Sequence, residues 1–170
     1  MILILSSDQF SSSVISKIFL AHGIWFGECS PPDMFNPHGG YENRDIKALL
    51  IHYYGGNIKP WPLLSEKYGF MRQVCDVLER QGYSGGRWAY VADPVFQNCF
   101  DSQGAFKIAV RPAMDKPDEH DQLDTIPYQL YLPELMEGHY RAISKIFTHC
   151  QIPFKKEIAD EIIGQSLQAA

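Results

Sequence analysis

Residues 1–23 decide the fold, and they read MILILSSDQFSSSVISKIFLAHG. The first five are uniformly apolar, which is typical of a central parallel strand buried on both faces. A polar stretch follows over residues 6–13, and apolar residues then recur at helical spacing: Val14, Ile15, Ile18 and Phe19. His22-Gly23 predicts the end of that helix. The polar turn therefore lies between a strand and a helix, where open α/β sheets bind ligands and helix N–H groups attract anions.

The remaining chain contains further predicted helices and strands. Helices are expected over 42–54, 63–81, 135–150 and 154–168, and strands over 87–91, 105–110 and 126–132. Residues 28–41 contain three prolines and two glycines, so we expect an ordered loop there rather than a regular element. The crossovers between strands are long, which favours parallel pairing with helices on both faces. The sequence thus predicts one domain over residues 1–170, a three-layer α/β/α fold around a mostly parallel sheet of four to five strands.

Apolar stripes identify the helix faces that we expect to be buried. In the helix over 63–81 the stripe consists of Leu64, Tyr68, Met71, Val74, Cys75 and Leu78. In the last two helices it consists of Ile143, Ile146, Phe147 and Cys150, and then Ile158, Ile162 and Leu167.

The composition narrows the classes of function. Of the 170 residues 45% are hydrophobic, so the chain can form a core without stabilisation by a structural metal or by disulfide bonds. A total of 15 basic and 20 acidic residues gives a net charge of −5, which weighs against a nucleic-acid-binding domain, although a local basic groove is compatible with it. No apolar run approaches the roughly 20 residues that cross a bilayer, and the N-terminus lacks the basic region of a signal peptide. We therefore expect a cytoplasmic protein without nucleic-acid or membrane partners.

Cysteines and histidines show no metal-binding pattern. The four cysteines form no CxxC pair and are expected to be free thiols, and the six histidines lack ligand spacing. The segment 113–125 carries five carboxylates and one lysine. We expect a solvated loop there, and the alternative is a metal site formed by these carboxylates. No spacing suggests a Ser-His-Asp, a Cys-His or a paired-carboxylate arrangement, and no metal is expected.

Four segments carry a resemblance to a known family. Residues 32–46, PDMFNPHGGYENRDI, are the most specific of them, and WAYVADP (88–94), FKIAVRP (106–112) and YLPEL (131–135) follow in order. With one extra glycine, the first resembles the pattern P-D-x-x-N-P-x-G-Y-x-E-[D/N]-R-[D/E]-I of bacterial sulfotransferase-family proteins; the others are similar to its W-x-x-K-D-P, R-x-P and Y-E-D-L segments. The resemblance implies a P-loop nucleotide-kinase type of fold. It also implies transfer of a sulfuryl group from 3′-phosphoadenylyl sulfate to a hydroxyl acceptor, a small molecule or a carbohydrate.

In this family the first strand leads into a loop G-x-x-[R/K]-S-G-[S/T]-[S/T] that holds the phosphosulfate. Aligned without gaps, Ser6 and Ser11 replace the two glycines and Gln9 replaces the cation. The residues that this alignment assigns to the cofactor are Ser6, Gln9, Ser11, Ser12 and Ser13. Glycines let N–H groups wrap an anion, and a cation neutralises it. Asp8 adds a negative charge that disfavours a phosphate by about 1–4 kcal/mol at about 4 Å. We therefore expect an eroded loop, with the serines acting either as helix caps or as weak ligands of a phosphate or sulfate anion.

Further candidate residues follow from the same comparison. Ala92 replaces the lysine of the K-D-P strand end. Arg111 stands where the family places an arginine near the 3′-phosphate, and its alternative role is to pair with nearby acids. Asp93 either orients the first loop through a hydrogen bond or is a turn residue. His38 and Glu42 flank the loop that closes on the acceptor side, and either could be a general base. The alternative is that the polar residues of this loop hold it in place and cap the next helix.

Three hypotheses about function stay open. The first is a sulfotransferase-like enzyme whose activity is in doubt because the loop is eroded. The second is a non-catalytic descendant of the same fold that binds a ligand or partner through the old cleft. The third is a relative of the P-loop kinases. The sequence names no partner, and a homodimer is among the oligomeric states open to it.

Overall fold

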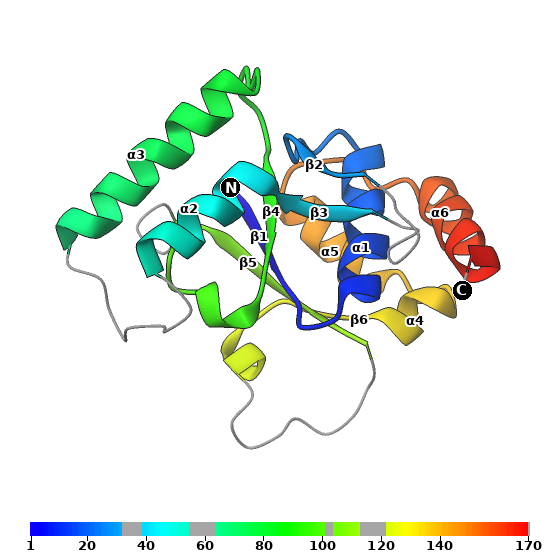
Figure 1. Ribbon diagram of the computed structural model, residues 1–170. Helices are drawn as coiled ribbons and strands as arrows, with labels where there is room; N and C mark the ends of the chain where they lie inside the picture. Colours follow the sequence, from blue (N-terminus) through cyan, green and yellow to red (C-terminus); the bar gives the residue numbers. More distant parts are fainter. Residues whose placement is uncertain (32–38, 55–63, 101–103, 113–121, 170) are drawn as a thin grey trace.

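A four-stranded parallel sheet forms the centre of the protein in the computed structural model, which describes residues 1–31, 39–54, 64–100, 104–112 and 122–169 (Figure 1). Its strand order is β4-β1-β5-β6. The strands are β1 (Ile2–Leu5), β4 (Ala89–Ala92), β5 (Phe106–Arg111) and β6 (Gln129–Tyr131). All three pairings are parallel, and Ile2 lies opposite both Ala89 and Phe106. The predicted α/β class and the four parallel strands are confirmed.

The strand β1 lies between two neighbours and is buried along its whole length. Side chains alternate across a sheet, so Ile2 and Ile4 join one hydrophobic cluster while Leu3 and Leu5 join the other. A strand in this position needs apolar residues at every position, which is why its sequence shows a continuous run instead of an alternation.

Helices cover both faces of the sheet, in agreement with a three-layer arrangement. The face of Ile2 and Ile4 packs against α1 (Gln9–Ala21), α4 (Leu132–Met136), α5 (Arg141–His149) and α6 (Lys156–Ala169). The face of Leu3 and Leu5 packs against α2 (Arg44–Tyr54) and α3 (Leu64–Arg80). Two short 3-10 helices, η1 (Pro94–Phe96) and η3 (Gln122–Thr125), follow β4 and precede β6. In the described part of the chain, no helix combines the length and apolar character that a bilayer crossing requires.

The segment 28–41 was expected to be a loop, and this prediction is wrong at its ends. Its described part contains β2 (Cys29–Ser30) and the start of β3 (Gly40–Asn43), which pair antiparallel in a second, two-stranded sheet. Glu42 therefore lies in a strand, and the next helix begins at Arg44. Asn43 determines that start, because its side-chain oxygen accepts a hydrogen bond from the Ile46 N–H at 3.2 Å.

Two other boundaries differ from the prediction. The helix expected over 135–150 is divided into α4 and α5 at Gly138, whose φ of +83° is the left-handed conformation that ends a helix. The strand expected over 126–132 is limited to β6, and Leu132 already belongs to α4. Part of the segment 113–125 proves to be the 3-10 helix η3, while residues 113–121 lie outside the described residues.

The predicted stripes of α3 and α6 are displaced around the helix axis, and the side chain of Leu64 lies outside the described residues. Tyr68 is 71% exposed and Leu167 is 53% exposed, and Cys75 is exposed as well. The core side of α3 is formed by Phe70, Met71, Val74, Val77 and Leu78, and that of α6 by Ala159 and Ile163. The inward residues predicted for α5 are confirmed: Ile143, Ile146, Phe147 and Cys150 are all buried. A helix that packs on a sheet from one side buries a narrow stripe, and residues at its margins reach solvent.

Candidate functional site

A cavity of about 260 Å³ opens at the carboxyl ends of β1 and β4. The turn over residues 6–9, the start of α1, the strand β3 and Asp93 after β4 form its walls. This is the edge of a parallel sheet at which open α/β folds bind their ligands. The polar turn that the sequence singles out is therefore part of the wall of a cavity.

The turn is closed by its own hydrogen bonds. The Ser6 hydroxyl donates to the Asp8 carbonyl at 2.9 Å and accepts from the Asp8 N–H at 3.1 Å. The Ser6 N–H donates to the Ala92 carbonyl at 3.2 Å, which attaches the turn to the end of β4. The N–H groups of Ser6 and Asp8, which a phosphate-binding loop would direct at a ligand, are in this way used within the protein.

Asp8 is the N-cap of α1. Its Oδ2 accepts a hydrogen bond from the Ser11 N–H at 2.6 Å. Such a cap stabilises a helix by about 1 kcal/mol, and a carboxylate at this position also complements the helix dipole. The anion at the N-terminus of α1 is thus a side chain of the protein itself.

The three serines that follow do not cap the helix. The Ser12 hydroxyl donates to the Gln9 carbonyl at 3.0 Å, and the buried Ser13 hydroxyl donates to the Gly39 carbonyl at 2.8 Å. The Ser11 hydroxyl is fully buried and has no hydrogen-bond partner within the described residues. Ser13 joins α1 to the start of β3, so its role here is to position that strand.

Glu42 extends from β3 into the cavity wall and forms an ion pair with Lys47 of α2. Asp8 and Asp93 line the same cavity. Three carboxylates against one ammonium group make the cavity electronegative, since Lys47 offsets only one of them. A general-base role for Glu42 stays a prediction, and its carboxylate already has a cation as partner.

The remaining candidates divide between this cavity and other places. Asp93 begins η1 and accepts from the Val95 N–H at 2.9 Å, which is the turn role that the sequence allowed. Arg111 lies outside the cavity wall and is 8% exposed. Its guanidinium pairs with Asp124 and donates from Nε to the Gln129 side-chain oxygen at 3.1 Å. The ion-pair alternative therefore describes Arg111. His38 lies outside the described residues.

Six of the nine candidates line one cavity: Ser6, Gln9, Ser12, Ser13, Glu42 and Asp93. Tyr41 and Lys47 line the cavity as well, and neither was among the predicted site residues. Burial raises the pKa of the Tyr41 hydroxyl above its ordinary value, so the form that donates a hydrogen bond persists to higher pH than in a free tyrosine. The start of a helix right after Asn43 is a local signal that could have placed Lys47 near Glu42, because Asn is a preferred N-cap residue.

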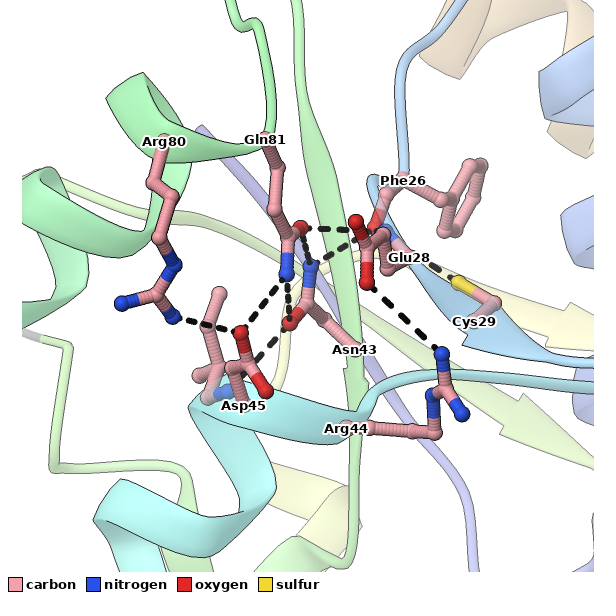
Figure 2. A network of polar contacts seen from close by, with 9 residues as sticks. Phe26, Glu28, Cys29, Asn43, Arg44, Asp45, Arg80 and Gln81 are labelled. Atoms are coloured by element: carbon pink, nitrogen blue, oxygen red, sulfur yellow. Dashed lines mark hydrogen bonds and ion pairs between the residues drawn. The ribbon is translucent and has the colours of Figure 1, made fainter.

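A network of amides and charges holds β3 in place (Figure 2). Asn43 is buried, and its Nδ2 donates to the Gln81 side-chain oxygen at 2.6 Å and to the Phe26 carbonyl at 3.3 Å. Gln81 also donates to Asp45 at 3.2 Å, and Arg80 pairs with Asp45 at 2.6 Å. The hydrogen bond from Arg80 lowers the pKa of Asp45. The end of α3 is thereby attached to the strand that carries Glu42.

The cofactor implied by the resemblance can be compared with these contacts. A phosphosulfate needs free N–H groups and cations, while the cavity has a carboxylate on its helix and Arg111 paired elsewhere. The described residues therefore do not fit that group. Among them, no three His, Cys, Asp or Glu side chains are placed to hold a metal ion. No protein-family model matches the chain, and no significant match is found among curated proteins or solved structures.

Proposed function

We propose that the protein is a binding protein whose cavity takes a small, uncharged molecule rich in hydroxyl groups, of the polyol or monosaccharide class. The observation that carries this proposal is the hydrogen bond from the Ser11 N–H to Asp8 at 2.6 Å. It gives the N-terminus of α1 an internal anion, so an anionic ligand would have to displace a carboxylate that is covalently part of the chain.

The chemistry of the walls supports a ligand that donates hydrogen bonds. Ionised carboxylates only accept, and serine hydroxyls both accept and donate. Asp8, Glu42 and Asp93 supply acceptors, and the hydroxyls of Ser6, Ser12 and Ser13, which donate their hydrogens to backbone carbonyls, can act towards a ligand only as further acceptors. An anion at about 4 Å from one of these carboxylates would be repelled by about 1–4 kcal/mol, whereas a hydroxyl pays no such penalty.

The size of the cavity supports the same class. Its volume of about 260 Å³ is just below the range of about 300–1,000 Å³ typical of drug-sized ligands. A sulfonucleotide is much larger than a single sugar ring, and only its terminal group would enter such a space.

The test is a ¹⁵N NMR titration with myo-inositol, glucose and glycerol. We expect saturable shifts of the backbone signals of residues 6–12 and 40–42. Glu42→Gln keeps the shape of the side chain but removes its charge, and it should weaken binding at least threefold. Glu79→Gln on the exposed side of α3 makes the same change in net charge and should leave binding unchanged. Absence of shifts in these segments at 50 mM polyol refutes the proposal.

Sulfuryl transfer on a P-loop type of fold is the second candidate. It is favoured by one observation, the position of the cavity at a strand–turn–helix junction. Calorimetry with 3′-phosphoadenosine 5′-phosphate, and with ATP for the kinase alternative, separates the candidates. Micromolar binding of either nucleotide would establish an anion site and overturn the polyol proposal. The loop reversion Ser6→Gly, Gln9→Arg and Ser11→Gly, combined with Asp8→Gly to remove the cap carboxylate, should gain nucleotide affinity if the loop is an eroded anion site.

A further inference from the structure

A second cavity, of about 860 Å³, lies between the start of β6 and the first two turns of α5. It shares no lining residue with the cavity beside Asp8. Its volume is within the range of about 300–1,000 Å³ that is typical of small-molecule sites. The two cavities therefore have to be explained separately.

The charge of this second cavity is opposite to that of the first. Arg141 and Lys145 line it one helical turn apart, together with His139 and a single carboxylate, Glu134. Within the part of the chain that the structure describes, neither Arg141 nor Lys145 has an ion-pair partner. Other arginines do form ion pairs, for example Arg80 with Asp45. In a chain of net charge −5, two cations against one carboxylate leave this concave surface with a net positive charge, which favours an anionic ligand.

The start of α5 adds to this positive potential. Tyr140 is its N-cap and makes no side-chain cap hydrogen bond, and the first turn contains no acidic residue. This contrasts with α1, whose N-terminus is capped by Asp8. The N-terminal end of a helix carries a partial positive charge, which here remains available beside Arg141.

Aromatic side chains form the apolar part of the wall and are held by their own contacts. The Tyr140 hydroxyl donates to Asp160 at 2.5 Å. The Tyr128 ring packs against Phe106 with centroids 4.5 Å apart and against His149 at 5.7 Å. Both tyrosines are half-buried, so each presents part of its ring to the cavity. A ligand with a flat apolar body would pack against these rings while its charged group meets the cations.

We propose that this cavity binds a small organic anion, an aromatic or aliphatic body that carries one carboxylate or phosphate group. Arg141 and Lys145 hold the charged group, and Tyr128 and Tyr140 contact the body. The arginine fork suits the two oxygens of a carboxylate or phosphate, and the lysine adds a point charge. The site is independent of the polyol cavity, so the failure of one proposal leaves the other in place.

The test uses four probes of similar size: phenyl phosphate, benzoate, benzyl alcohol and benzylamine. In a ¹⁵N NMR titration we expect the two anions to shift the backbone signals of residues 139–146 and to bind at least fivefold more tightly than the alcohol or the amine. Raising the salt concentration from 0.05 to 0.5 M should weaken anion binding severalfold, because mobile ions screen exposed charges. Preference for phenyl phosphate or for benzoate identifies which anion the site selects.

Variants test the two cations. Arg141→Gln combined with Lys145→Gln should weaken binding of the anions at least tenfold and leave benzyl alcohol unaffected. Arg72→Gln combined with Lys155→Gln removes the same charge from exposed positions elsewhere and should change affinity less than twofold. Equal binding of anions and alcohol, shifts in another part of the protein, or anion affinity unchanged in the first variant would overturn the proposal. The comparison of probes and the salt dependence need only the unmodified protein, so they decide the matter even if a variant fails to fold.

Discussion

Gly27 is a position at which one added methyl group should be strongly destabilising. Its φ is +72°, and a Cβ atom built there would lie 2.3 Å from Asn43 Nδ2, 2.5 Å from Gln81 Oε1 and 2.7 Å from Trp25 Cη2. The left-handed conformation destabilises Ala relative to Gly by about 1–2 kcal/mol. The displaced amides lose buried hydrogen bonds, which adds about 1–3 kcal/mol. We therefore expect Gly27→Ala to lower the free energy of unfolding by about 2–5 kcal/mol.

Gly82→Ala is the matched control. Gly82 has a similar φ of +82°, but an added Cβ would have no atom within 4 Å. This variant carries only the conformational penalty, about 1–2 kcal/mol. The difference between the two variants, about 1–3 kcal/mol, measures the damage to the network of Asn43 and Gln81. It corresponds to a difference of about 2–12 °C in Tm for a chain of this length.

Equilibrium unfolding in urea is the assay, with the midpoint compared at an unchanged m-value. Adding Gln81→Ala to each glycine variant completes a double-mutant cycle. It should rescue part of the loss in Gly27→Ala, because one of the colliding atoms is gone, and none of the loss in Gly82→Ala. Equal midpoints for the two glycine variants would show that the close approach is harmless and that the reasoning about this network is wrong.

Three further predictions concern other parts of the protein. Burial raises the pKa of Cys29 from 9.0 to about 11, so only about one Cys29 thiol in a thousand is ionised at pH 8. Mass spectrometry should therefore find Cys29 unmodified after treatment with iodoacetamide at pH 8. Because the folded state binds this proton more tightly, its contribution to the free energy of unfolding should be complete below pH 9 and decline towards pH 11. His22→Phe keeps a ring but loses the hydrogen bond from the Lys155 N–H at 2.9 Å. Hydrogen exchange at the Lys155 amide should therefore accelerate, and the free energy of unfolding should fall by about 1–2 kcal/mol. Asp124→Ala removes a carboxylate that pairs with the nearly buried Arg111, and calorimetric unfolding should show a loss of about 1–3 kcal/mol; a loss under 0.5 kcal/mol would contradict a structural role for this pair.

Local patterns were sufficient to predict the elements around the cavity. The apolar run of β1 and the spacing of Val14, Ile15 and Ile18 predict a strand and a helix because each pattern depends on neighbouring residues only. The cap by Asp8 is also local, since its partner is three residues away. Asp8 was predicted only as an unfavourable charge beside a phosphate, although Asp before a helix is a known cap signal.

Features that depend on distant residues were not predictable in this way. β2 and β3 pair across the segment 31–39, and two and four residues give too little pattern to recognise a strand. Asn43 meets Gln81 from another helix, and no spacing within one sequence indicates that contact. For Arg111 the sequence left two roles open, and the choice depended on how η3 folds back to bring Asp124 near β5.

The central place of β1 also has a consequence for the order of folding. Its two neighbours in the sheet, β4 and β5, are more than half a chain away in sequence. During synthesis the opening hydrophobic strand leaves the ribosome long before either neighbour exists, and closing such long loops is slow. Until then its apolar side chains can be covered only by helices that are already synthesised, α1 on one face and α2 and α3 on the other, and its two edges stay unpaired. This segment is therefore where a chaperone or an aggregating neighbour would engage the nascent chain.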